Sequence, residues 1–162
     1  MQMTRALLMC SALLLPAVAG AHGDAHPKKP GVVKMEQKPW GIGGNARSVR
    51  RTIEIQMTDN MRFTPDRIEV RQGDTIRFIL PNGGKQMHEF VLGTKQELDE
   101  HAALMKKFPK MEHDEPYMAH VSPASKGEII WTFNRAGDFF FGCLLPGHYE
   151  AGMVGSIRVV AR

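Results

Sequence analysis

The chain has 162 residues, of which 21 are lysine or arginine and 17 are aspartate or glutamate, giving a formal net charge of +4. A chain of this length suits one domain with its own hydrophobic core. The basic residues are scattered and are not interleaved with aromatic residues, which argues against a nucleic-acid-binding protein.

The first 21 residues have the pattern of an export signal. Arg5 supplies a positive start, residues 6–19 form an apolar run, and small residues surround Ala19 and Ala21. The apolar run is too short to span a membrane, so we expect cleavage after Ala19 or Ala21 and no membrane anchor afterwards. We therefore predict a signal peptide over residues 1–21 and a periplasmic location.

Removal of this leader leaves one cysteine in the mature protein. Cys10 lies within the apolar run, so Cys143 alone remains. A single cysteine cannot form an internal disulfide. In an oxidising compartment its thiol must be buried, paired with another chain, or bound to a metal.

Next in chain order come a tail and then a series of short strands. Residues 22–48 are rich in proline, glycine and lysine, so we expect a flexible tail containing Met and His, with Trp40 tucked against the domain. From residue 49 to 162, short runs alternate between apolar and polar residues, which predicts antiparallel strands in a two-sheet sandwich. The runs are residues 51–59, 66–82, 86–93, 127–134, 137–145 and 152–161.

One segment, residues 94–108, breaks the alternation and predicts a helix. Thr94 and Glu97 form a capping box, and Pro109 ends the helix. We therefore expect an all-β sandwich with one short helical insertion over residues 94–125, the rest of which is a loop. Four apolar residues fall on one face of the helix: Leu98, Ala102, Met105 and Phe108.

A thiol, an imidazole and a thioether recur at regular spacing near the C-terminus. Cys143, His148 and Met153 are each separated by four residues. The best candidate for a fourth ligand is His88, which follows the turn at residues 82–84 and should lie near one end of the sandwich. Two imidazoles, one thiolate and a weak axial thioether define a trigonal type 1 copper site.

Other interpretations explain this spacing less well. Structural zinc sites usually have more than one cysteine or a paired histidine motif, and the H-E-x-x-H motif fails because Leu92 stands where its second His should be. A purely structural interpretation makes Cys143 a buried core thiol and His148 a solvent-facing loop residue. A metal-free sandwich could pair Cys143 with another chain, but the spacing to His148 and Met153 would then have no role.

These segments resemble the cupredoxins, the plastocyanin and azurin superfamily, over about residues 52–160. More narrowly, residues 87–116 and 143–157 look like those of the CopI-type periplasmic cupredoxins associated with bacterial copper tolerance. The superfamily resemblance rests on the motifs Cys143-x4-His148-x4-Met153 and His88-Glu-Phe, and on residues 63–78.

The resemblance implies a Greek-key cupredoxin β-sandwich of eight strands with copper at one end, ligated by His88, Cys143, His148 and an axial Met153. Many electron-carrying cupredoxins have Asn or Ser after the first ligand His, where it ties the two ligand loops together. This chain has Glu89 there. The resemblance therefore does not imply the tie, and a blue or green colour stays open.

The insertion carries further soft ligands. Thioethers and imidazoles suit cuprous copper, so a second copper site is one interpretation. The alternative is that the methionines pack in the core and the histidines are ordinary surface residues. The residues concerned are His101, Met105, Met111, His113, Met118 and His120.

The function that follows is copper binding in periplasmic copper tolerance or homeostasis, extended by redox cycling of copper. The alternative is a soluble electron carrier between redox enzymes, which would need a redox partner protein. The Met/His-rich insertion favours the first interpretation, because an electron shuttle does not need it. We expect one type 1 copper with additional Cu(I), a monomer, and no enzymatic turnover, because the ligands leave no position for a substrate.

Overall fold

A computed structural model describes residues 36–109 and 114–162 of the chain. The expected signal peptide, the first part of the expected tail, Met111 and His113 lie outside the described residues. Within the described ranges, no helix is long and apolar enough to cross a membrane.

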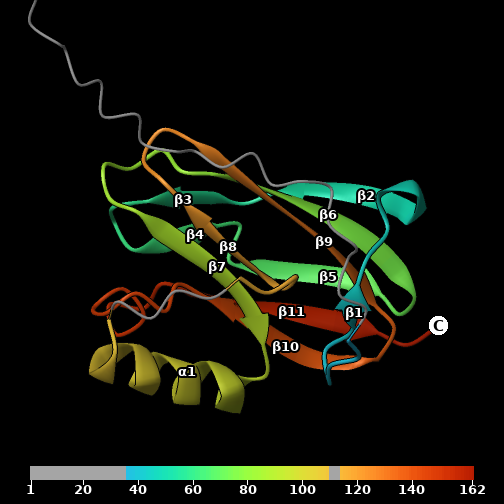
Figure 1. Ribbon diagram of the computed structural model, residues 1–162. Coiled ribbons are helices and arrows are strands. Elements are labelled where there is room, and N and C mark those ends of the chain that lie inside the picture. The colour runs from blue at the N-terminus through green and yellow to red at the C-terminus, as the bar shows by residue number, and fades with distance from the viewer. Residues whose placement is uncertain (1–35, 110–113) are drawn as a thin grey trace, which may run out of the picture. The chain divides into compact units, whose positions relative to one another are not determined.

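Two β-sheets pack face to face, and a short hairpin accompanies them (Figure 1). The first sheet has the order β1 (Ile42–Gly43), β9 (Lys126–Phe133), β6 (Asp74–Pro81) and β2 (Val49–Glu54). The second has the order β5 (Arg67–Arg71), β11 (Val154–Val160), β10 (Gly137–Gly142), β7 (His88–Gly93) and β8 (Met118–Val121). The hairpin joins β3 (Gln56–Thr58) and β4 (Arg62–Thr64). The predicted all-β sandwich is confirmed.

The sequence pattern predicts antiparallel strands, but two of the strand pairs are parallel. β2 pairs with β6 in parallel, and β5 pairs with β11 in parallel. Alternation of apolar residues specifies which face of a strand is buried but not the direction of its neighbour. The direction follows from where the chain crosses between the sheets, which local periodicity does not encode.

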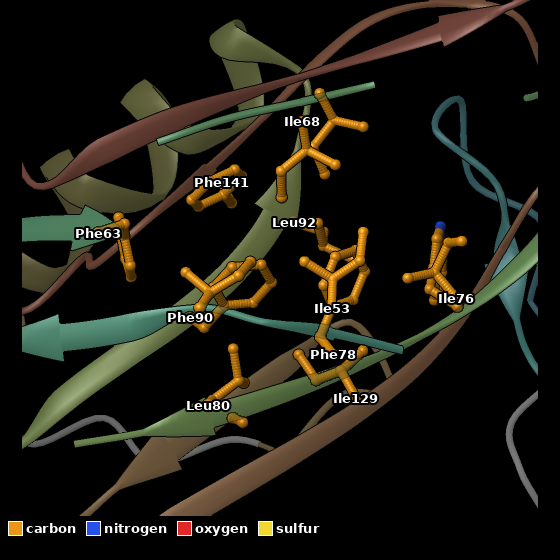
Figure 2. Close-up of a cluster of buried hydrophobic side chains, with 14 of the residues drawn as sticks. Ile53, Phe63, Ile68, Ile76, Phe78, Leu80, Phe90, Leu92, Ile129 and Phe141 are labelled. Atoms are coloured by element: carbon orange, nitrogen blue, oxygen red, sulfur yellow. The ribbon is translucent and has the colours of Figure 1, made fainter. Parts of the chain in front are cut away.

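The core lies between the two sheets and consists of alternate strand residues. Phe78 on β6, Trp131 on β9 and Phe141 on β10 are almost completely buried. Figure 2 shows Phe78, Phe90 and Phe141 projecting into the same interior as the aliphatic side chains of neighbouring strands. Each such large side chain contributes about 1.5–3 kcal/mol on burial, so this interior is the main stabilising element of the sandwich.

The packed domain begins before residue 49, which is the boundary that the sequence pattern predicts. Trp40 is buried, and its ring stacks on Trp131 with 6.5 Å between ring centroids. The indole N–H of Trp131 donates to the carbonyl of Trp40 at 3.1 Å, and β1 pairs with β9. The expected packing of Trp40 against the domain is therefore confirmed, but residues around it belong to the packed domain and not to a flexible tail. The sequence pattern could not show this, because β9, on which this segment packs, lies far away along the chain.

The expected helix forms as α1 (Lys95–Lys107). Its capping box is present: the Thr94 side chain accepts from the backbone of Glu97, and the Glu97 side chain accepts from the backbone of Thr94. Leu98, Ala102 and Met105 are buried as predicted. Phe108 is 56% exposed and lies beyond the end of the helix, so it does not share the face of the other three residues as predicted. The helix ends at Lys107, and Phe108 leaves the helical backbone conformation.

The rest of the insertion is not entirely a loop. Met118 to Val121 form β8, which pairs antiparallel with β7 from His88 to Val91. The four-residue run is too short for alternation to distinguish it from a loop. It becomes a strand because it lies along the open edge of β7, where its backbone groups find partners.

Candidate metal centre

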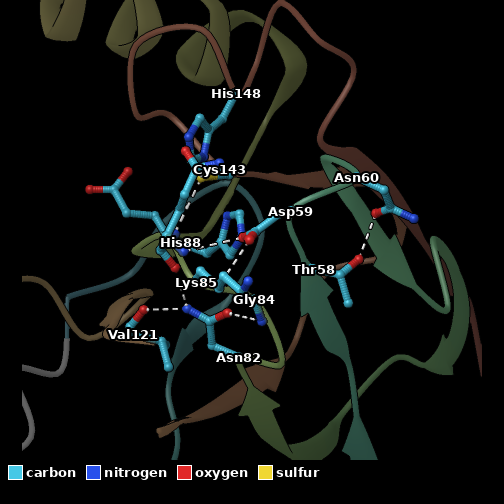
Figure 3. A network of polar contacts seen from close by, with 12 residues as sticks. Thr58, Asp59, Asn60, Asn82, Gly84, Lys85, His88, Val121, Cys143 and His148 are labelled. Carbon is cyan, nitrogen blue, oxygen red and sulfur yellow. Dashed lines mark hydrogen bonds and ion pairs between the residues drawn. The ribbon is translucent and has the colours of Figure 1, made fainter. Parts of the chain in front are cut away.

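Three of the four predicted ligands meet at one end of the sandwich (Figure 3). One ligand atom from each of His88, Cys143 and His148 lies within 4.8 Å of the other two. His88 is the first residue of β7, Cys143 follows β10, and His148 lies in the segment between β10 and β11. His88 and Cys143 are fully buried, whereas His148 is half-buried.

The segment Cys143–Met153, here called the ligand loop, is held by its own backbone. The N–H of Cys143 donates to the carbonyl of Met153 at 3.0 Å, which joins the two ends of the loop. Gly147, at φ +89°, makes the turn that brings His148 back toward Cys143. The N–H of Met153 then donates to the carbonyl of His148 at 3.1 Å. Met153 is fully buried and is a backbone neighbour of Cys143.

Asp59 orients the ring of His88. Nε2 of His88 lies 3.2 Å from Oδ1 of Asp59. Backbone N–H groups of Lys85 and Gln86 donate to the same carboxylate, and the bond from Lys85 is the main cause of the lowered pKa of Asp59. Because an ionised carboxylate only accepts, we assign the ring hydrogen to Nε2, so that Nδ1 presents a lone pair.

The buried Nδ1 of His88 has no hydrogen-bond partner among the described residues. A buried polar atom without a partner is costly unless something else binds it. On the other ring, Nδ1 of His148 lies 3.3 Å from Sγ of Cys143. Two imidazole nitrogens and one thiol thus converge on the same small volume, and this donor set fits a copper ion.

The Cys143 thiol is protonated when no metal is bound. Burial raises its pKa to about 12, although the N–H of Glu89, which donates to Sγ at 3.3 Å, partly opposes that shift. Burial, and then the neighbouring His88 ring, lower the pKa of His148. A metal must therefore displace the thiol proton, whereas the His148 ring is already neutral at neutral pH.

Glu89 ties the two ligand segments together. Its side chain is 1% exposed, and Oε2 accepts a hydrogen bond from the N–H of Leu144 at 3.3 Å. The strand that carries His88 is thereby joined to the residue after Cys143. The resemblance left this tie without support because Glu89 replaces the usual Asn or Ser. The structure shows that a carboxylate makes it.

The second oxygen of Glu89 reaches toward the surface. Oε1 lies 2.6 Å from Nε2 of His120 on β8. The His120 side chain is 28% exposed. A buried acid beside the ligand loop is therefore in contact with a side chain that reaches solvent.

The other candidate ligands of the insertion lie in different environments. Met105 and Met118 are buried in one apolar cluster, which also contains Leu144 of the ligand loop. His101 is half-buried on α1. Met111 and His113 lie outside the described residues, so the second copper site stays a prediction. The burial of Met105 and Met118 supports the packing alternative for these two residues.

Comparison with known proteins identifies the family to which this chain belongs. A family model described as copper binding proteins of the plastocyanin/azurin family matches residues 49–160. The chain belongs to this family of copper-binding proteins.

Within the family, relatives named CopI match almost the whole chain. The chain is 44% identical over 160 residues to "Copper-resistant cuproprotein CopI" of Rubrivivax gelatinosus, with 96% of each chain covered. It is 33% identical over 184 residues to the CopI protein of Pseudomonas aeruginosa, covering 96% of this chain and 97% of that protein. The CopI-type resemblance is therefore confirmed.

Solved structures agree on the fold. Auracyanin B matches with a TM-score of 0.63 at 18% identity, covering 74% of this chain and 96% of that one. Dithionite-reduced auracyanin from Roseiflexus castenholzii matches with a TM-score of 0.60 at 21% identity, covering 69% of this chain and 98% of that one. At these identities the likeness shows the cupredoxin fold alone.

Two residues at the site were not assigned roles from the sequence. Asp59 lies 29 positions before His88, and no spacing rule connects them. Glu89 stands next to a ligand, which was the available signal, but its bond to Leu144 depends on how β7 and the ligand loop pack.

Proposed function

We propose that this protein is an exported type 1 copper protein that acts in periplasmic copper tolerance. The proposed ligands are His88, Cys143 and His148, with Met153 as the axial ligand. The observation that carries the proposal is the convergence of three ligand atoms within 4.8 Å of one another at a buried end of the fold. The copper-resistance relatives, which align over nearly the whole chain, support the biological role.

Bound copper would supply a one-electron couple between Cu(II) and Cu(I). The chain contributes an environment that holds the ligands in place: Asp59 holds the ring of His88, and the N–H of Glu89 donates to the Cys143 sulfur. Fixed ligands lower the rearrangement needed when the oxidation state changes. We propose binding and redox cycling rather than turnover, because a four-ligand site leaves no position for a substrate.

The periplasmic location rests on residues 1–21, whose charge and apolar pattern match an export signal. Mass spectrometry of protein from a periplasmic extract should give an N-terminus at Gly20 or His22. An intact Met1 on protein from that extract would contradict cleavage.

A soluble electron carrier is the second candidate. The observation that favours it is the half-buried ring of His148, which connects the ligand cluster to solvent and would offer a route for an electron. That role would need a redox partner protein. Copper tolerance is the first candidate because of the relatives and because the Met/His-rich insertion has no evident use in a shuttle.

Growth of a deletion strain across copper concentrations distinguishes the two functions. We expect poor growth in high copper, restored by the native gene and not by Cys143→Ser, with normal respiration at low copper. A respiratory defect at low copper with unchanged copper tolerance would instead support the electron carrier.

A further inference from the structure

Helix α1 lies against the ligand loop and makes polar contacts just after His148. The hydroxyl of Tyr149 donates to Oδ1 of Asp99 at 2.8 Å. The ammonium of Lys106 lies 2.6 Å from Oε1 of Glu150. Because Tyr149 and Glu150 are the two residues that follow His148, the helix holds the loop on that side of the proposed ligand.

The same helix holds the beginning of the ligand loop through apolar contacts. Leu144, which follows Cys143, is 1% exposed and packs in the second apolar cluster. The ring of Tyr149 lies close to the end of β10, since a Cβ on Gly142 would be only 2.9 Å from it. The helix residues of this cluster are Leu98, Ala102 and Met105.

These contacts are unequal in strength. The Lys106 and Glu150 side chains are 55% and 38% exposed, and exposed ion pairs contribute little to stability. The charged acceptor strengthens the hydrogen bond from Tyr149 to Asp99, although the Asp99 side chain is 48% exposed and also accepts from Lys95. Burial of Leu144 contributes most, because it removes a whole aliphatic side chain from water.

We propose that α1 is a positioning element for the ligand loop, acting through the Tyr149–Asp99 hydrogen bond and the packing of Leu144. It restrains Cys143 and His148 before any metal binds, so that the ligands need little rearrangement when copper enters or changes oxidation state. The inference rests on the proposed copper site for its use, but the restraint itself exists in the metal-free protein. It also gives the buried face of the insertion a role apart from copper binding.

The restraint can be measured without copper by amide hydrogen exchange on the full chain. The reporters are the N–H groups of His148, Ala151, Gly152 and Met153, which donate within the ligand loop. Tyr149→Phe keeps the ring and removes only the hydroxyl. We expect exchange at these amides to accelerate about tenfold in Tyr149→Phe and in Asp99→Ala.

A double-mutant cycle tests whether the two residues act as one unit. Asp99→Ala also removes the ion pair with Lys95, so its effect includes more than the Tyr149 hydrogen bond. Adding Tyr149→Phe to Asp99→Ala should accelerate exchange no further, because the hydrogen bond between the two residues is already lost. Asp99→Asn keeps an acceptor oxygen and should restore most of the protection. The matched control is Gln96→Ala, which removes an exposed hydrogen bond to Glu100 on the same helix and should leave the loop unchanged.

Copper-loaded protein gives an independent measurement. In Tyr149→Phe we expect an altered EPR hyperfine splitting and release of Cu(I) to a chelator about tenfold faster, with unchanged copper stoichiometry. Native exchange in both single variants, or acceleration spread evenly over all strands, would overturn the role of the Tyr149–Asp99 hydrogen bond in positioning the loop. Absence of a visible copper band in the native protein would instead overturn the proposed copper site, and the metal-free exchange result would be unaffected.

Discussion

The carboxylate of Glu89 accepts a hydrogen bond from the N–H of Leu144 at 3.3 Å, which joins the strand of one proposed ligand to the residue after another. The same residue donates its own N–H to the sulfur of Cys143. An amide or hydroxyl at this position could make the tie without charge. An ionised acid at this position adds a negative charge in a buried place beside the ligand loop.

Replacing Glu89 with Gln should raise the reduction potential. Glutamine keeps an oxygen that can accept from Leu144 but removes a charge that favours Cu(II) over Cu(I). At several Å and an effective dielectric constant of about 20, one charge shifts the potential on the order of 100 mV, and the contact with His120 reduces this effect. Redox titration measures the shift, with Glu100→Gln as an exposed control. A lower potential would contradict the argument.

Replacing Asp59 with Asn should weaken copper binding. The change keeps an acceptor for Nε2 of His88 but removes the charge that makes the ring a better ligand. Loss of such a partner typically lowers metal affinity about 10–100-fold. Competition with a chelator measures the affinity. Asn60→Ala is the control in the same turn, since Asn60 accepts from Thr58 rather than from His88. Equal copper affinities in the two variants would show that the charge of Asp59 does not support copper binding.

The proposed ligands should differ in their effect on the spectrum. Native protein loaded with copper should show intense visible absorption from thiolate-to-copper charge transfer, which Cys143→Ser should abolish. Met153→Leu should keep the copper and raise the potential, because an apolar side chain donates nothing to Cu(II). Optical and EPR spectra with redox titration test both. An unchanged potential in Met153→Leu would show that Met153 is not the axial ligand.

Copper affinity should depend on pH through the thiol. The pKa of Cys143 is about 12, so at neutral pH a proton must leave when the thiolate binds metal. The apparent association constant for Cu(II) should therefore rise about tenfold per pH unit near neutrality. Burial lowers the pKa of His148 from its usual value of 6.5, so that ring is already neutral at neutral pH. Protonation of His148 therefore steepens the pH dependence of copper affinity only in more acidic solution. Chelator competition at several pH values should find no such slope near neutrality in Cys143→Ser.

Binding of Cu(I) by the insertion should not depend on its buried methionines. Changing Met105 and Met118 to Leu conserves their volume, so each change should cost under about 1.5 kcal/mol of stability and leave the copper stoichiometry unchanged. Changing Met111 to Leu with His113 to Gln should remove one cuprous equivalent without altering the visible spectrum. Anaerobic competition with a cuprous chelator measures both variants. A native copper stoichiometry in the second variant would show that the insertion only packs against the domain and does not bind Cu(I).

The strands, the helix and the clustering of His88, Cys143 and His148 could be predicted from the sequence, largely because of local pattern. Alternation of apolar residues marks the buried faces of β6 and β9, and the capping box at Thr94 marks the start of α1. Cys143, His148 and Met153 share one short loop, so their spacing alone indicated a metal site. His88 was found because a turn precedes its strand-like run.

The tertiary structure decided what depends on residues far apart in the chain. Trp40 packs on Trp131, and Asp59 holds His88, because sheet packing closes those separations. Whether a carboxylate at Glu89 ties the ligand loops depended on the position of the Leu144 N–H relative to β7, which no local rule contains. Local periodicity records which face of a segment is buried, whereas the partner on that face is set by how the whole chain packs.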